Sequence, residues 1–268
     1  TSLLTSLVSY IGIWKFFRLL NTLYPGHLKI FSIIILYLPS LIFWGGGIMK
    51  DSFVLGSTCW LTYNFYCVLI GRKKVLLNII FMFLNGLIII NIKPYVIISL
   101  LPGMLTWLYS AYLKNISDSI LRFLMFPIIG LLITGGGYLV FNNLSSMMGV
   151  YGGVDTAIQQ AQVIQEDLLR EDQYGSNNYN LGQIDGSVFS LIRVAPSAIF
   201  TALFRPLPWE IGSITMIFSV VENTLLLIFV FWSLLKINPF RFFKILFKEP
   251  FMLYCFIFSI LFAFGVGI

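Results

Sequence analysis

Long apolar runs repeat along this chain, and they limit its fold more than any other feature. Hydrophobic residues make up 58% of the sequence and charged residues 10%, and the mean hydropathy is +0.90. A helical run of about 18 to 22 residues is long enough to cross a hydrocarbon core of about 30 Å. The strands of a membrane barrel would alternate apolar and polar residues, and these runs do not alternate. The sequence therefore predicts an all-α polytopic membrane protein.

A window reading predicts about seven to eight membrane-spanning helices. Residues 1–24 form the weakest element, because Lys15 and Arg18 interrupt it, and we interpret it as either the end of a span or a helix in the membrane interface. The chain starts without Met and ends inside an apolar run, so we expect it to be an interior piece of a longer protein. The seven stronger spans are expected near 30–49, 53–70, 75–92, 95–113, 120–141, 211–235 and 250–268.

The apolar pattern stops between Phe141 and Ile211, where seven of the eleven acidic residues lie. This gap divides the chain into an N-terminal bundle (1–141), a large loop (142–210) and C-terminal membrane helices (211–268). A large acidic loop between spans indicates binding or chemistry on one face of the membrane.

Two segments of the loop are expected to be helical. Residues 154–172 are rich in helix formers and carry one apolar stripe, which predicts an amphipathic surface helix. Residues 188–204 are apolar but are interrupted by Arg193 and Pro196, so an interfacial or re-entrant helix is expected there.

The basic residues predict the orientation of the chain. Alternate loops carry twelve of the seventeen Lys and Arg residues, and the positive-inside rule assigns these loops to the cytoplasm. The 142–210 loop, Lys50-Asp51 and Lys93-Pro94 then face outward, as expected for a multi-pass protein of a bacterial inner membrane. The net charge of +6 is thus explained by orientation, and we expect no nucleic-acid partner.

Several classes of site are disfavoured by composition. The three cysteines fall in apolar runs without the spacing of metal ligands, and the chain has one histidine, His27. A histidine-based metal site or a Ser/His triad within this piece is therefore not expected, and no metal or cofactor is predicted.

Charged residues at the outer ends of early spans are the first candidates for function. Asp51, beside Lys50, follows a span that ends in three glycines, and its carboxylate could act as a base or orient a sugar hydroxyl. The pair could equally be a charged stop at a helix end. Lys93 precedes Pro94 at the same predicted depth, where it could bind an anion or only extend to the interface.

A second group of charged residues surrounds the end of the large loop. Arg205 and Glu210 flank Pro206, Pro208 and Trp209, and a guanidinium held in such a rigid turn could bind a phosphate through two donors. The alternative is an interfacial anchor.

Two further residues complete the predicted outward-facing set. Arg193, in the 188–204 segment, is a further candidate cation for substrate. Glu222 lies about twelve residues into the predicted 211–235 span, where a carboxylate requires a polar partner or a wet cavity. Several cations and carboxylates on one membrane face suit a lipid-linked anionic substrate such as a diphosphate.

Two segments resemble a known group of proteins. PSLIFWGGGIMKDS, followed by GRKK and NIKPY, resembles the central region of bacterial polysaccharide repeat-unit polymerases and related membrane glycosyltransferases of the GT-C type, and AIFTALFRPLPWE resembles an outer-loop segment of the same broad group. The resemblance implies transfer of a glycan from a polyprenyl diphosphate to an acceptor, with arginines binding the diphosphate. An outward histidine, usual in O-antigen ligases, is absent here, since His27 is assigned to the cytoplasm.

Two other classes of function remain open. A transporter or flippase for the same lipid would predict an internal repeat or broken helices near the membrane midplane, whereas the breaks here lie at the outer rim. A structural subunit could dock a protein partner on the acidic 154–172 helix. Membrane lipids are expected partners in all three cases.

The orientation can be tested by labelling. A Ser176→Cys variant should react with a membrane-impermeant maleimide in intact spheroplasts, because residue 176 is assigned to the outer loop. Labelling that occurs only after lysis would reverse the predicted topology.

Overall fold

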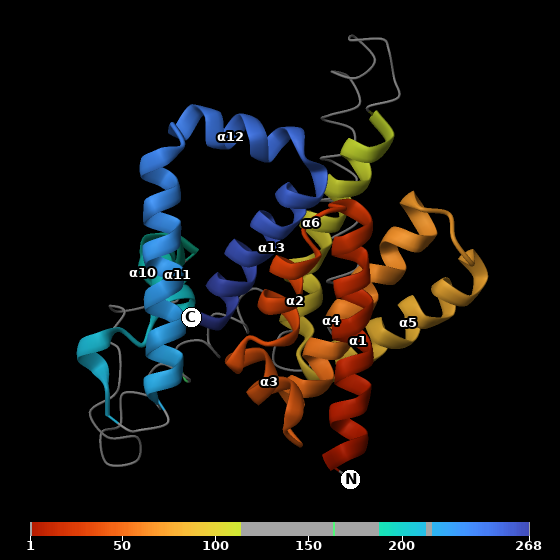
Figure 1. The fold of residues 1–268 in the computed structure, drawn as a ribbon, viewed down its shortest axis with the longest axis horizontal. Helices are drawn as coiled ribbons and strands as arrows, with labels where there is room; N and C mark the ends of the chain where they lie inside the picture. The colour runs from red at the N-terminus through yellow and green to blue at the C-terminus, as the bar shows by residue number, and fades with distance from the viewer. Residues whose placement is uncertain (1, 114–162, 164–187, 213–215, 268) are drawn as a thin grey trace. The chain divides into compact units, whose positions relative to one another are not determined.

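The computed structural model describes residues 2–113, 163, 188–212 and 216–267, and every regular element within those ranges is a helix (Figure 1). The chain divides into two compact units, residues 1–97 and 98–268, and the division falls inside one helix, α6 (Pro94–Leu113). The predicted all-α class is therefore confirmed for the described part of the chain.

Five of the described helices are long and apolar enough to cross a membrane, and a bent pair of shorter helices makes a sixth if it forms one span. The chain thus has the character of a multi-pass membrane protein. The predicted span at 120–141 lies outside the described residues, and so does the predicted surface helix at 154–172 apart from Val163. The predicted total of seven to eight spans stays a prediction for that reason.

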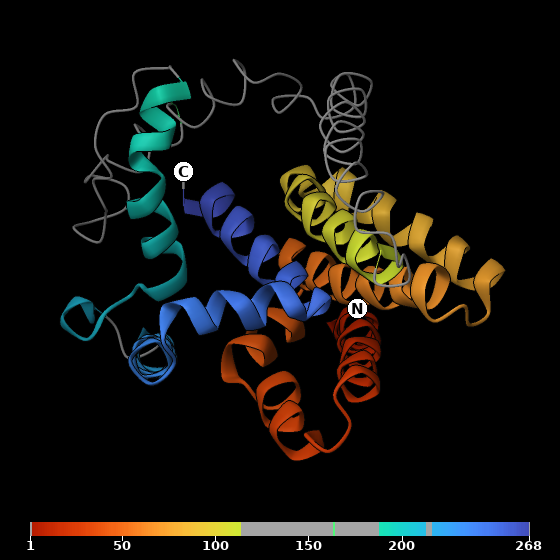
Figure 2. The same ribbon diagram turned by 90° about the horizontal axis from the view of Figure 1, so that it is seen from above.

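The first unit contains six helical segments, seen from two sides in Figures 1 and 2. They are α1 (Ser2–Leu23), α2 (Leu28–Leu36), α3 (Pro39–Gly46), α4 (Lys50–Phe65), a π-helical turn η1 (Tyr66–Ile70) that extends α4, and α5 (Val75–Ile92). The α4–η1 segment and α5 form a hairpin of two candidate spans joined by the basic turn at 71–74.

The region expected to form a span at 30–49 consists of two helices, α2 and α3, which are bent by 49° at their junction. The break has a local cause. Leu38 adopts an extended conformation, with φ −68° and ψ 123°, because the ring of the following Pro39 disfavours helical geometry in the residue before it. Pro39 then starts α3, since proline is well suited to the first turn of a helix.

Close packing of α1 against α4 is the best-defined contact of the first unit. A methyl group added to Gly12 would overlap the backbone carbonyl of Gly56, and one added to Gly56 would lie 2.6 Å from Cα of Ser9. Small residues are typical where membrane helices approach closely, because little hydrophobic force acts between helices in lipid. The weak element at 1–24 is thus a continuous helix packed on a candidate span.

The second unit is built around α13 (Pro250–Gly267). Gly267 of α13 meets the backbone of Ala198 in α10 (Val188–Phe204), and Gly103 of α6 lies against Tyr254. Both contacts again use a glycine at the crossing point. The unit also contains η3 (Pro208–Glu210), α11 (Met216–Lys236) and α12 (Pro239–Lys248).

The glycine contact of α1 and α4 generates a stability prediction. Gly12→Ala should lower the free energy of unfolding by about 1–3 kcal/mol, because the added methyl group forces two backbones apart. The matched control is Gly86→Ala in α5, where the new methyl group would make only an ordinary 3.8 Å contact with Leu61. Thermal unfolding of the detergent-solubilised variants measures both. An unchanged midpoint for Gly12→Ala would contradict the close packing.

Candidate functional site

The turn between α10 and η3 holds the most highly organised group of charged atoms in the described residues. Arg205 follows the last residue of α10, and its backbone N–H still donates to the carbonyl of Thr201 at 3.1 Å. The Arg205–Pro206 peptide bond is cis, and Pro208 begins η3. Two prolines therefore fix the backbone on which Arg205 and Glu210 stand.

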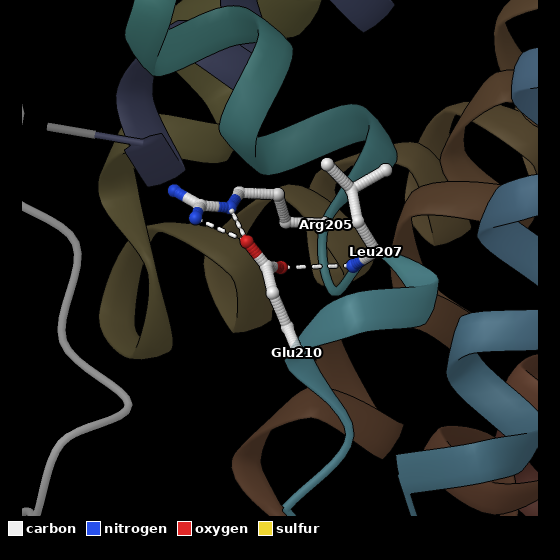
Figure 3. Close-up of polar contacts among 3 residues, drawn as sticks. All are labelled: Arg205, Leu207 and Glu210. Carbon is white, nitrogen blue, oxygen red and sulfur yellow. Dashed lines mark hydrogen bonds and ion pairs between the residues drawn. The ribbon is translucent and has the colours of Figure 1, made fainter.

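Glu210 binds both the side chain of Arg205 and the backbone of the turn (Figure 3). Its Oε1 accepts hydrogen bonds from Nε of Arg205 at 2.7 Å and from Nη2 of the same guanidinium. Its Oε2 accepts from the backbone N–H of Leu207 at 2.8 Å, and the backbone N–H of Glu210 donates to the carbonyl of Leu207 at 2.9 Å. Both carboxylate oxygens are thus occupied in shaping the turn.

This arrangement fixes the direction of the guanidinium. Nε and Nη2 form the edge that faces the carboxylate, and the other terminal nitrogen points away from it (Figure 3). The side chains of Arg205 and Glu210 are 29% and 14% exposed, so the pair is partly shielded from solvent. Charge-assisted hydrogen bonds of this kind are about twice as strong as neutral ones.

The pair also changes the acidity of Glu210. Hydrogen bonding from the Arg205 guanidinium lowers the pKa of the Glu210 carboxyl below its usual value near 4.5, and the Leu207 N–H and the charge of Arg205 act in the same direction. Burial opposes this shift but does not outweigh it. Glu210 is accordingly a carboxylate, and not a proton donor, at neutral pH.

A residue of the neighbouring helix α11 also binds the turn. Nδ2 of Asn223 in α11 donates to the backbone carbonyl of Arg205 at 2.7 Å. Glu222, the preceding residue, is half-buried and is the seventh residue of α11, which begins at Met216.

The second charged pair closes the open end of the α4–α5 hairpin. Nζ of Lys93, at the end of α5, donates to Oδ1 of Asp51, in the first turn of α4. Their side chains are 28% and 37% exposed. This contact places the Lys50-Asp51 and Lys93-Pro94 turns at the same end of the hairpin, as the charge pattern predicted.

The environment of Lys93 keeps its side chain charged. Burial lowers the pKa of the ammonium group, but hydrogen bonds and charge attraction from Asp51 and Tyr95 outweigh burial and raise the pKa above its usual value of 10.5. The ammonium group is therefore a permanent positive charge at this end of the hairpin.

The glycine-rich segment before α4 is held by a residue that the sequence reasoning missed. Oγ of Ser52 lies 2.6 Å from the backbone carbonyls of both Trp44 and Gly47, and its side chain is fully buried. A serine directly after the charged pair, in the first turn of a helix, was the available signal. Asn223 was likewise not predicted to hold the turn, although it directly follows Glu222, one of the predicted site residues.

The structure brings together two pairs among the predicted site residues. Arg205 pairs with Glu210 in the second unit, and Asp51 pairs with Lys93 in the first. Lys50 is exposed at the first position of α4, and Arg193 is exposed on α10.

An apolar cavity of about 360 Å³ lies between α1, α2 and α3. Its lining includes Leu7, Ile35, Leu36 and Ile42, and a hydroxyl in the lining, that of Ser6, donates to the carbonyl of Gly46 at 2.7 Å. Such a lining suits a hydrocarbon chain better than a sugar.

Within the described ranges, no group of three His, Cys, Asp or Glu residues is arranged to hold a metal ion. No family model, no curated protein and no solved structure matches the chain. The site must therefore be interpreted from its own chemistry.

The lowered pKa of Glu210 predicts a pH-dependent contribution to stability. The Arg205–Glu210 pair should stabilise the fold above about pH 4.5, and this stabilisation should disappear as the pH falls through the lowered pKa and the carboxylate is protonated. Glu210→Gln should cost about 1–3 kcal/mol at neutral pH, and its unfolding midpoint should converge with that of the wild type in acid.

Thermal unfolding between about pH 7 and pH 3 measures this effect. Glu249→Gln, which removes the same charge at the end of α12, serves as the control. A difference in unfolding midpoint between Glu210→Gln and the wild type that stayed constant with pH would contradict the proposed role of the ionised Glu210 carboxylate.

Proposed function

We propose that the chain belongs to a membrane-embedded glycan polymerase or glycosyltransferase that acts on polyprenyl-diphosphate-linked oligosaccharide at the outer leaflet of a bacterial inner membrane. The observation that carries the proposal is the rigid turn that aims the Arg205 guanidinium. Besides the Nε/Nη2 edge that faces Glu210, a planar guanidinium has a second edge, formed by its two terminal nitrogens, whose parallel donors match the oxygens of a phosphate or diphosphate.

The surroundings of the turn favour a lipid-linked substrate over a soluble one. Arg205 and Glu210 precede α11, a candidate span, so a ligand of Arg205 would meet the protein near the membrane boundary. Trp209, between them, is 78% exposed, and tryptophan is enriched at that depth. The apolar cavity beside α1 independently supports a hydrocarbon ligand.

We propose a role for each candidate residue within its own unit. Arg205 would bind the diphosphate, and Glu210, whose oxygens hold the turn, would position Arg205. Asp51 would act as a base or orient a sugar hydroxyl, with Lys93 fixing its carboxylate. Lys50, Arg193 and Glu222 are proposed as contacts to substrate.

Arg205→Lys tests whether donor geometry matters beyond charge. If the guanidinium clamps a diphosphate, the variant should lose about 10- to 100-fold in activity, since an ammonium group does not reproduce a planar pair of donors. Restoration of glycan assembly in a strain lacking the native copy measures activity. Arg72→Lys, in the exposed basic turn before α5, is the matched control.

Asp51→Asn should also reduce turnover while leaving membrane insertion intact. Full glycan assembly by both Arg205→Lys and Asp51→Asn would leave these residues as interfacial anchors. The structural-subunit hypothesis would then be preferred, and co-purification of a second protein at fixed stoichiometry would support it.

A further inference from the structure

The ten-residue helix α12 carries three distinct faces. It joins the end of α11 to the start of α13, and both figures show it running across the ends of these two helices (Figures 1 and 2). Asn238 begins it, accepting a hydrogen bond from the backbone N–H of Phe240 at 3.1 Å. Pro239 and Pro250 start α12 and α13, so the corners on both sides of α12 are stiff.

The first face packs on the protein. Leu246 is 7% exposed, and the ring of Phe242, one turn earlier, meets that of Phe256 in α13 edge-to-face at 6.3 Å. This contact fixes the rotation of α12 about its own axis and therefore determines what the other two faces meet.

The second face is aromatic and uncovered. Phe240, Phe243 and Phe247 follow the i, i+3, i+7 spacing of one helix face, and their side chains are 87%, 50% and 66% exposed. Three phenylalanine rings held in water would be unfavourable, because each ring leaves a large apolar surface unburied.

The third face is basic. Arg241, Lys244 and Lys248 repeat the same spacing one position later and are exposed. At the end of α11, the ammonium group of Lys236 lies 4.6 Å from the ring centre of Trp232, a pair typical of a membrane boundary.

We propose that α12 lies in the membrane surface and binds anionic lipid headgroups. The helices on both sides of it are candidate spans, so their connection must lie at a bilayer face. With the helix in that plane, the three phenylalanines enter the upper acyl region while the basic face meets phosphate groups. The occupant is thus the lipid surface itself, selected by charge complementarity.

This inference is independent of the proposed glycan chemistry. The Arg205–Glu210 turn precedes α11 and α12 follows it, so the two features lie at opposite ends of a candidate span. Loss of lipid selectivity and loss of glycan assembly are therefore separate outcomes.

The first test measures binding of phosphatidylglycerol to the purified full chain by native mass spectrometry and by lipid-induced thermal stabilisation. The wild type should prefer phosphatidylglycerol to phosphatidylcholine, and added salt should weaken the preference. An Arg241→Gln/Lys244→Gln variant should bind phosphatidylglycerol about 10- to 30-fold more weakly, since two of the cations are removed.

The matched control is Arg72→Gln/Lys73→Gln, which removes the same charges from another exposed basic segment. It should retain the preference of the wild type. An equal loss of phosphatidylglycerol binding in both variants would show that the preference depends only on the net charge of the protein, and not on α12. Unchanged binding in the α12 variant would likewise overturn the proposal.

A second test measures whether the aromatic face of α12 lies in the membrane, and it does not depend on charge. In nanodiscs containing the purified chain alone, a cysteine at Phe243→Cys should resist an aqueous maleimide, whereas one at Lys244→Cys should react, with the wild type setting the background of its three cysteines. Equal reaction at both positions would place α12 in water. This result would overturn the proposal and favour a protein partner for the phenylalanines.

Discussion

The high cost of placing a charge in hydrocarbon governs the arrangement of the described helices. Asp51 stands in the first turn of α4 and Lys93 at the end of α5, so their ion pair lies where the hairpin leaves the apolar region. Arg205 and Glu210 lie in the turn before α11, and the basic face of α12 follows that helix. In each case the long apolar helices are left almost without charge, and the polar chemistry collects at their ends.

That separation also explains why the Arg205 turn is the best candidate for recognition. A turn at a membrane boundary has few packed neighbours to hold a long side chain, and here Glu210 accepts hydrogen bonds from the Arg205 guanidinium. The Leu207 N–H in turn donates to Glu210, and the Asn223 amide donates to the backbone carbonyl of Arg205. The guanidinium direction is therefore fixed within the turn itself, as the proposed function would require. Preorganisation of this kind raises affinity because less conformational entropy is lost on binding.

Sequence reasoning was effective where one physical rule dominates. Helix positions followed from apolar length, and the expectation that Lys93 and Asp51 share one end of a hairpin followed from alternating charge. It failed where geometry depends on a neighbour. The bend between α2 and α3 needed the effect of Pro39 on Leu38.

The site could be predicted only as a set of residues. Charge and position identified Arg205 and Glu210, but nothing in their spacing indicates that both oxygens of Glu210 are used within the turn. The role of Ser52 depends on two backbone carbonyls that only folding brings to it. Hydrogen bonds from side chains to the backbone join atoms that are close in space but leave no recognisable pattern in the sequence. Such contacts therefore cannot be predicted from a stretch of sequence alone.

One consequence concerns bilayer thickness. The 21 residues of α11 span about 31 Å, close to the hydrocarbon thickness of a typical membrane. Val220 is the one residue of this helix that is buried against the described part of the chain. Asn223, the eighth residue of α11, binds the turn that holds Arg205, and the far end of the helix leads into α12. If α11 crosses the membrane, a thinner bilayer that increases its tilt would also move the turn that holds Arg205.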